Sequence, residues 1–223
     1  MRLDKLLSNL KYGSRNDIKK LCKKGLITVN DSVVKDSGIN VLPTDIIMID
    51  GEEVFYKENI TLMLNKPKGY ICANKDGMHK TVLELIKEPY SRYDLNIAGR
   101  LDIDTEGLII LTTDGNLLHN IISPNKDVYK KYYVEYEGIL EEGILENGIE
   151  ILDGNNNPYL TKEAKVEYLN AGRINLWIKE GKFHQVKRML EYCGCKVTYL
   201  KRLEIGEYKL DEKLGLGEYK IIE

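Results

Sequence analysis

Residues 99–105 gather charged side chains directly in front of an apolar run. Arg100, Asp102 and Asp104 alternate there with apolar residues, and residues 108–111 read Leu-Ile-Ile-Leu. Such a run, closed by polar residues and a glycine, predicts a short buried strand. Charges beside a buried strand are costly unless they are paired or used, although a surface ion-pair cluster is the commoner outcome for an arbitrary loop. A carboxylate held there could act as a nucleophile at a sugar carbon, and two could cleave a glycosidic bond.

Two later segments carry further candidate groups. Residues 128–136 are rich in aromatic and β-branched residues, which predicts a strand, and Tyr132 lies within its K-x-Y-x-V portion. Residues 180–190 read E-G-K-F-H-Q-V-K-R-M-L. The glycine predicts a turn, and the residues after it predict a helix whose first turns carry Lys187 and Arg188.

The run G-R-L-D-x-x-T-x-G, followed by four apolar and two hydroxyl residues, resembles the signature of the small-subunit rRNA pseudouridine synthase family over residues 99–113. The K-x-Y-x-V and E-G-x-x-H-Q-V-K-R-M segments resemble later motifs of that family, and N-K-P-x-G-Y at residues 65–70 resembles its first motif. The resemblance covers nearly the whole chain. It implies an α+β fold in which a mixed, mainly antiparallel sheet is flanked by helices.

By that resemblance the protein converts a uridine of 16S rRNA, uridine 516, into pseudouridine by flipping the base, and it needs no cofactor. The resemblance implies that Asp102 is the catalytic nucleophile and that Lys187 is the cation that pairs with it. It also implies that Tyr132 stacks on the flipped base and that Arg100 enters the RNA stack. Covalent and glycal routes both stay open.

Three alternatives accompany this interpretation. A sister enzyme acting on large-subunit rRNA or tRNA would share the same motifs. A glycoside hydrolase could use Asp102 and Asp104 as its two carboxylates, but the single Trp gives no aromatic sugar platform. An inactive RNA-binding protein would predict a broken motif at Asp102, Tyr132 or Lys187, and all three positions are intact.

The N-terminal residues predict a separate RNA-binding module. Apolar residues in 2–10 follow helical spacing, and Ser14 can cap a second, basic helix that ends at Gly25. Residues 27–34 predict two short strands around an Asn-Asp turn, and residues 45–50 another strand. M-R-L-D-K-L-L and K-G-L-I-T-V-N resemble landmarks of the S4 RNA-binding domain, which implies domains at 1–58 and 59–223. The residues expected to contact RNA are Arg2, Lys5, Arg15, Lys19, Lys20, Lys23, Lys24, Lys66 and Arg188.

Other segments predict the framework around these residues. Residues 61–64 predict a strand, Thr81 can cap a helix that runs through Ile86, and residues 117–122 have helical spacing. The acidic residues 141–150 predict a surface helix. Asp102 and Asp104 would point roughly the same way if the backbone between them were extended.

The composition is that of a globular protein whose charge is unevenly distributed. The net charge is −2, yet residues 1–30 hold eight basic and two acidic residues, and residues 135–153 hold seven acidic and none basic. This polarity favours a nucleic-acid partner: 16S rRNA or a small-subunit assembly particle, rather than DNA or a membrane. The four cysteines are scattered, which predicts reduced thiols and no metal site. With no long apolar run or signal sequence, we expect a cytoplasmic monomer.

Overall fold

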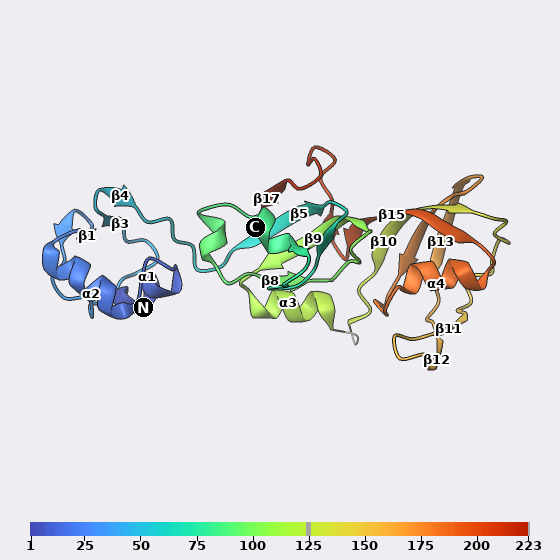
Figure 1. Ribbon diagram of the computed structural model, residues 1–223, viewed down its shortest axis with the longest axis horizontal. Helices are drawn as coiled ribbons and strands as arrows, with labels where there is room; N and C mark the ends of the chain where they lie inside the picture. The colour runs from blue at the N-terminus through green and yellow to red at the C-terminus, as the bar shows by residue number, and fades with distance from the viewer. Residues whose placement is uncertain (124–125, 223) are drawn as a thin grey trace. The chain divides into compact units, whose positions relative to one another are not determined.

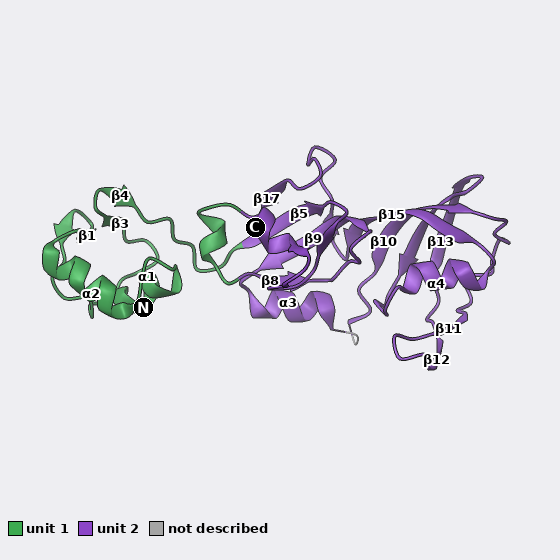
Figure 2. Ribbon diagram, viewed as in Figure 1, with its two compact units in different colours: residues 1–60, 87–94 green, residues 61–86, 95–223 purple. Residues whose placement is uncertain are grey.

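The computed structural model describes residues 1–123 and 126–222, which form two compact units (Figure 2). The first unit holds residues 1–60 and 87–94, and the rest of the described chain forms the second. The division expected from the sequence is 1–58 and 59–223. The units differ from it in their boundary, which follows residue 60, and in the segment 87–94, which belongs to the first unit.

The first unit pairs two helices with a small antiparallel sheet. The helices are α1 (Leu3–Asn9) and α2 (Arg15–Lys24), and the sheet has the order β2-β1-β3-β4. Its strands are β1 (Ile27–Val29), β2 (Ser32–Val33), β3 (Ile47–Ile49) and β4 (Glu52–Glu53). Apolar residues at helical spacing in α1 pack with Ile18 and Ile27 into one core. Ser14 and Asp17 form the capping box that begins α2, and Gly25 ends it in the left-handed conformation at φ 78°.

Residues 87–94 complete this unit with aromatic contacts. The 3₁₀ helix η2 (Tyr90–Arg92) brings the Tyr90 ring edge-on to Phe55, with ring centroids 5.5 Å apart. The Arg92 guanidinium lies 4.2 Å from the centre of the Tyr12 ring, and the Tyr93 hydroxyl accepts a hydrogen bond from the backbone of Lys57. Several residues distant in sequence thus share one packed surface.

The second unit is built on a mixed, mainly antiparallel sheet, as expected (Figure 1). Its order is β13-β14-β10-β15-β9-β5-β17, with β16 beside β15 and β8 beside β9. The strands are β5 (Thr61–Lys66), β8 (Asn96–Ala98), β9 (Glu106–Thr112), β10 (Lys130–Glu137), β13 (Lys165–Asn170), β14 (Arg173–Ile178), β15 (Lys196–Ile205), β16 (Tyr208–Lys209) and β17 (Tyr219–Ile221).

Helices and small strand pairs flank this sheet. Helix α3 (Gly115–Ile122) lies against β8 and β9, and α4 (Gln185–Tyr192) lies against β15 (Figure 1). Two short pairs stand apart from the main sheet: β6 (Tyr70–Ile71) with β7 (Lys80–Thr81), and β11 (Glu150–Leu152) with β12 (Pro158–Leu160). No helix in the described ranges is long and apolar enough to cross a membrane.

The parallel pairing of β9 with β15 depends on Gly107. Gly107 has φ 107°, and a Cβ there would lie 2.2 Å from the carbonyl oxygen of Arg202. Only glycine combines that backbone conformation with so close an approach. The side chain of Arg202 is fully buried beside it and donates to the carbonyls of Leu108 at 2.9 Å, Arg100 at 3.2 Å and Gly99. This junction fixes the start of the loop that carries Asp102.

Two predicted helices differ from expectation. Residues 141–150 form turns that lead into β11 rather than a surface helix. Gly143 and Gly148 have φ values of 82° and 75°, which are incompatible with a right-handed helix and leave too short a segment between them to nucleate one. The segment that Thr81 caps is a 3₁₀ helix, η1 (Val82–Leu85), rather than an α-helix through Ile86.

Candidate active site

The loop between β8 and β9 carries Asp102 in a tight turn rather than in extended backbone. The Thr105 amide donates to the Asp102 carbonyl at 3.2 Å, and the Gly69 amide donates to the Ile103 carbonyl at 2.8 Å. The Leu101 amide donates to the Cys72 thiol at 3.3 Å, and burial raises the pKa of that thiol. The backbone between the two aspartates is therefore not extended, the condition under which their side chains would point the same way does not hold, and the turn sets their directions.

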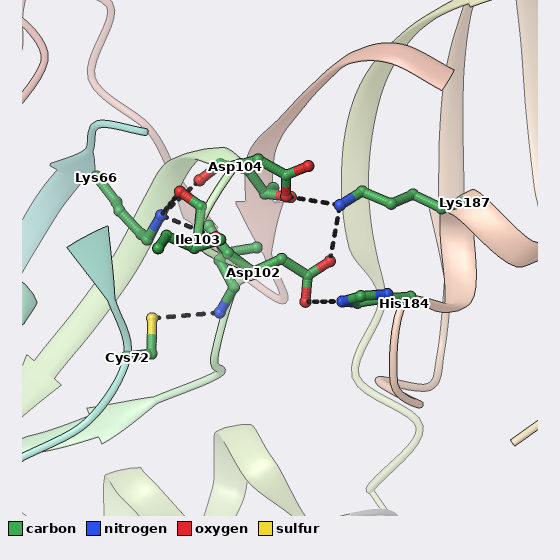
Figure 3. Close-up of polar contacts among 9 residues, drawn as sticks. Lys66, Cys72, Asp102, Ile103, Asp104, His184 and Lys187 are labelled. Atoms are coloured by element: carbon green, nitrogen blue, oxygen red, sulfur yellow. Dashed lines mark hydrogen bonds and ion pairs between the residues drawn. The ribbon is translucent and has the colours of Figure 1, made fainter. Parts of the chain in front are cut away.

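The Lys66 side chain reaches this loop from β5, at the left of Figure 3. Its ammonium donates to the carbonyls of Thr105 at 2.7 Å, Asp102 at 2.9 Å, Pro67 at 3.2 Å and Ile103 at 3.4 Å. Burial lowers the pKa of Lys66, while nearby acidic groups oppose that shift. The side chain is 0% exposed, so the expectation that Lys66 contacts RNA is wrong. It holds the backbone of the loop instead.

Lys187 joins both aspartates. Its ammonium lies 3.3 Å from Asp102 Oδ2 and 2.6 Å from Asp104 Oδ1 (Figure 3). Burial raises the pKa of Asp104, but the hydrogen bond and charge of Lys187 outweigh it, so the pKa of this carboxyl lies below its ordinary value. The Asp102 side chain is 26% exposed and the Asp104 side chain 60%. Asp102 is therefore the better shielded of the two carboxylates.

His184 is a site residue that sequence reasoning missed as a functional group. Its Nε2 lies 3.6 Å from Asp102 Oδ1, the carboxylate oxygen that does not face Lys187. The histidine was visible within the E-G-x-x-H-Q-V-K-R-M segment, but nothing in a one-dimensional pattern shows which side chain it meets. The two oxygens of Asp102 thus have different partners.

A small pocket lies beside these groups. Asp102 lines it together with Leu101, Tyr132, His184, Lys187 and Leu200. Tyr132 is buried on β10, and Arg100 is exposed at the same pocket. The cavity volume is roughly 60 Å³, which makes it a small pocket.

The structure brings together four of the residues selected from the sequence, Arg100, Asp102, Tyr132 and Lys187. Arg188, which is half-buried, has a second contact set that the sequence did not indicate. The Arg188 guanidinium donates to the carbonyls of Leu152 and Asp153, which ties α4 to the β11–β12 hairpin. Its expected contact with RNA stays a prediction.

The remaining basic residues lie on the first unit and are exposed: Arg2, Lys5, Arg15, Lys19, Lys20, Lys23 and Lys24. Arg2 forms a two-point contact with Asp4, with distances of 3.1 and 2.7 Å. Lys20 lies 3.4 Å from Asp17. The other five provide positive charge on α1 and α2 with no carboxylate within ion-pair distance among the described residues.

Residues 1–123 and 126–222 contain no set of side chains that could bind a metal ion. No group of three His, Cys, Asp or Glu side chains there could hold a metal ion. The four cysteines are free thiols. The polar groups that meet at the pocket are a carboxylate, an ammonium, an imidazole and a phenol, which are suited to nucleophilic and proton-transfer chemistry.

Comparison with known proteins assigns both units. The family model for RNA pseudouridylate synthase matches residues 60–192, and the S4 domain model matches residues 1–47. The first match spans the loop of Asp102, Tyr132 on β10 and the whole of α4. The sequence motifs and the family model therefore point to the same residues.

Full-length relatives agree. The chain is 44% identical over 228 aligned positions to an uncharacterized RNA pseudouridine synthase of Bacillus subtilis, covering 99% of this chain and 94% of that protein. It is 39% identical to ribosomal small subunit pseudouridine synthase A of Pasteurella multocida, covering 99% and 95%. A crystal structure of a pseudouridylate synthase superposes with a TM-score of 0.68 at 36% identity, covering 100% of this chain and 96% of that one. The chain belongs to the RNA pseudouridylate synthase family and carries an N-terminal S4 domain.

Proposed function

We propose that this protein isomerises uridine 516 of 16S rRNA to pseudouridine, using Asp102 as the nucleophile. The target is supported by the small-subunit names of its full-length relatives. The chemical assignment rests above all on one observation. Of the two aspartates in the loop, Asp102 lines the pocket. Its carboxylate lies between the side chains of Lys187 and His184.

The reaction breaks the N1–C1′ bond of uridine and forms a C5–C1′ bond. The Asp102 carboxylate attacks C1′, forms an ester bond to it and displaces the uracil ring as its N1 anion. The ring turns within the pocket, and C5 attacks C1′, which breaks the ester bond and returns Asp102 to its ionised form. The C5 proton is then lost and N1 gains a proton, so atoms and charge balance without a cofactor. The ammonium of Lys187, 3.3 Å from Asp102 Oδ2, favours the ionised carboxylate that this attack needs.

The substrate base must leave the RNA stack to reach Asp102. Arg100, exposed at the pocket, takes the vacated place in the stack, and Tyr132 supplies the ring against which the base lies. Closing the base between Tyr132 and Asp102 excludes water from the reacting atoms.

The S4 domain supplies affinity for the RNA backbone. Its exposed lysines and arginines on α1 and α2 meet phosphates, which positions the enzyme without reading sequence. We expect the protein to act as a cytoplasmic monomer on 16S rRNA or on a small-subunit assembly particle. DNA and membranes are not its partners.

The first experiment compares the wild type, Asp102→Asn and Asp104→Asn on unmodified small-subunit and large-subunit rRNA. Both substitutions remove one carboxylate that meets Lys187, so they are matched in charge. We expect one new pseudouridine, at uridine 516, that disappears only with Asp102→Asn. Carbodiimide labelling and primer extension locate the modified site.

The other outcomes are equally informative. Modification confined to large-subunit rRNA would reassign the target and keep the chemistry. Turnover retained by Asp102→Asn would end the nucleophile assignment. If naked RNA stays unmodified, the same comparison on small-subunit particles lacking the modification decides whether a ribonucleoprotein is required.

A further inference from the structure

His184 departs from the usual rules for the start of a helix. It is the N-cap residue of α4, yet its side chain makes no capping hydrogen bond, and its φ is 53°. Serine, threonine, aspartate and asparagine are favoured at this position, and a left-handed conformation is uncommon outside glycine, although histidine adopts it more often than most residues do. Such local strain persists where the surrounding structure enforces it, and it accumulates at functional sites.

The surroundings of His184 form a continuous series of contacts. The imidazole stacks on the Phe183 ring, with centroids 3.8 Å apart and planes inclined by 19°. The Arg188 guanidinium lies 5.2 Å from the centre of the same Phe183 ring. Arg188 in turn is fixed by the carbonyls of Leu152 and Asp153. The series therefore leads from the β11–β12 hairpin to the Asp102 carboxylate.

A second set of bonds holds the same turn from the other strand of the hairpin. The Gln185 side chain accepts from the Lys182 amide at 3.0 Å and donates to Glu180 at 2.8 Å. Glu180 accepts from the Lys162 amide at 3.1 Å and from the Tyr159 hydroxyl. The backbone on which His184 sits is thus tied to both sides of the hairpin, which restricts where the imidazole can lie.

The two aspartates differ in their contact with His184. Lys187 reaches both of them and lies closer to Asp104, so it does not by itself select which carboxylate faces the pocket. His184 lies within ion-pair distance of Asp102 and lines the pocket with it, whereas Asp104 is mostly exposed. The imidazole is therefore the contact that distinguishes the two carboxylates.

We propose that Arg188, Phe183 and His184 are positioning residues that keep Asp102 directed at the substrate. This inference rests on the proposed function, because it names what aims the nucleophile of that reaction. His184 holds Asp102 Oδ1 from the side, Phe183 fixes the plane of the imidazole, and Arg188 anchors Phe183 to the hairpin. A displacement of about 1 Å at a reacting group can lower a rate roughly a hundredfold.

The test substitutes Phe183, whose side chain is remote from the reacting atoms and whose residue is 55% exposed. Phe183→Leu removes the stacking ring, and Phe183→Tyr keeps it. We expect Phe183→Leu to lower kcat about tenfold or more while KM stays within about twofold, since positioning acts on the transition state. Phe183→Tyr should restore kcat to within about twofold of the wild type.

Tyr192→Leu provides a matched control. Tyr192, the last residue of α4, is 60% exposed; it lines a surface hollow beside Arg188 but makes neither of the ring contacts of Phe183. Its kcat and KM should match the wild type, and circular dichroism should show that all variants are folded. An unchanged kcat in Phe183→Leu, or a change confined to KM, would contradict the positioning role.

A second measurement does not depend on turnover. In an otherwise wild-type, folded protein, Asp102→Asn should shift the ring nitrogen signals of His184 in a nuclear magnetic resonance spectrum. Asp104→Asn should shift the same signals much less. In the Phe183→Leu background the response to Asp102→Asn should be lost. If Asp102→Asn leaves the His184 signals unchanged in the otherwise wild-type protein, the positioning proposal is refuted. This outcome does not depend on whether an RNA substrate is converted. A responsive His184 in an inactive protein would instead refute the proposed function alone.

Discussion

At the scale of single residues, three cationic side chains of the site do different work because their burial differs. Lys187 is partly exposed and meets carboxylates, so it acts on charge. Lys66 and Arg202 are buried and donate to backbone carbonyls, so they fix the shape of the loop. Residue type alone does not distinguish these tasks, since each is simply a basic residue in the printed sequence.

Lys66→Met should destabilise the protein and disable the loop. The substitution removes a donor from four carbonyl oxygens, of which those of Asp102 and Ile103 keep a backbone amide donor, and an unsatisfied buried polar group costs about 1–3 kcal/mol. We expect the free energy of unfolding at neutral pH to fall by about 2 kcal/mol, measured by urea denaturation. Lys68→Met, at an exposed neighbouring lysine, is the control and should leave stability nearly unchanged.

The pH dependence of the unfolding free energy of the wild type and of Lys66→Met gives an independent check. Burial lowers the pKa of Lys66 in the folded protein, so the unfolded state binds more protons between that lowered pKa and the ordinary lysine value of 10.5. Stability contributed by Lys66 should therefore rise with pH through that window. The difference in unfolding free energy between wild type and Lys66→Met should widen from pH 7 towards pH 10, and a constant difference would contradict a buried amine.

At the scale of elements, the parallel contact of β9 with β15 decides where the Asp102 loop begins. That contact pairs Gly107 with Arg202, although the two residues are about a hundred positions apart, and brings their backbones into close contact. Arg202 then donates to the loop from β15. The loop is thus held by a strand that lies far away in the sequence.

Gly107→Ala should disrupt this junction. The added methyl group would lie 2.2 Å from the Arg202 carbonyl oxygen, and φ 107° is unfavourable for alanine. We expect a loss of more than about 3 kcal/mol, seen as a markedly lower midpoint in thermal unfolding. Gly143→Ala is the control that separates backbone strain from steric collision. Gly143 has φ 82°, but a methyl group added there would meet nothing within 4 Å. We expect this substitution to cost about 1 kcal/mol. Equal costs at the two positions would show that the close approach is unimportant.

At the scale of the whole molecule, the two units divide the task between RNA affinity and chemistry. The exposed cations of α2 lie in the first unit, and the pocket lies in the second. Residues 87–94 belong to the first unit although they are encoded within the second. Removing residues 1–54 would also remove Tyr12, against which the Arg92 guanidinium packs, so substitution is the cleaner test of the RNA-binding role.

Replacing Lys19, Lys20, Lys23 and Lys24 together with alanine should weaken RNA binding and flatten its salt dependence. Each lost phosphate contact lowers the slope of log K against log salt by about 0.7–0.9, so four contacts would lower it by about 3. Filter binding between 50 and 200 mM salt, as an order-of-magnitude range for this effect, measures the slope. Arginine at the same four positions should retain both affinity and slope. An unchanged slope in the alanine variant would exclude α2 from the RNA interface.

The sequence by itself determined the local structure and the chemistry that could occur. Some features act only through neighbouring residues and could therefore be predicted from the sequence. They are the helical spacing in residues 3–9, the Ser14 cap, Gly25 and the apolar run before Thr112. The motif resemblance identified the family and the pocket residues Arg100, Asp102, Tyr132 and Lys187. These signals depend on short separations along the chain.

Only the tertiary structure decided what each of those groups touches. The contacts of buried Lys66, the bond from the Gly69 amide to the Ile103 carbonyl, the brace made by Arg188 and the contact of His184 with Asp102 all join segments widely separated in sequence. Glycines at positive φ also broke the acidic segment predicted as a helix. Side-chain partners follow from packing and strand order, and both are set by the collapse of the whole chain rather than by any local pattern.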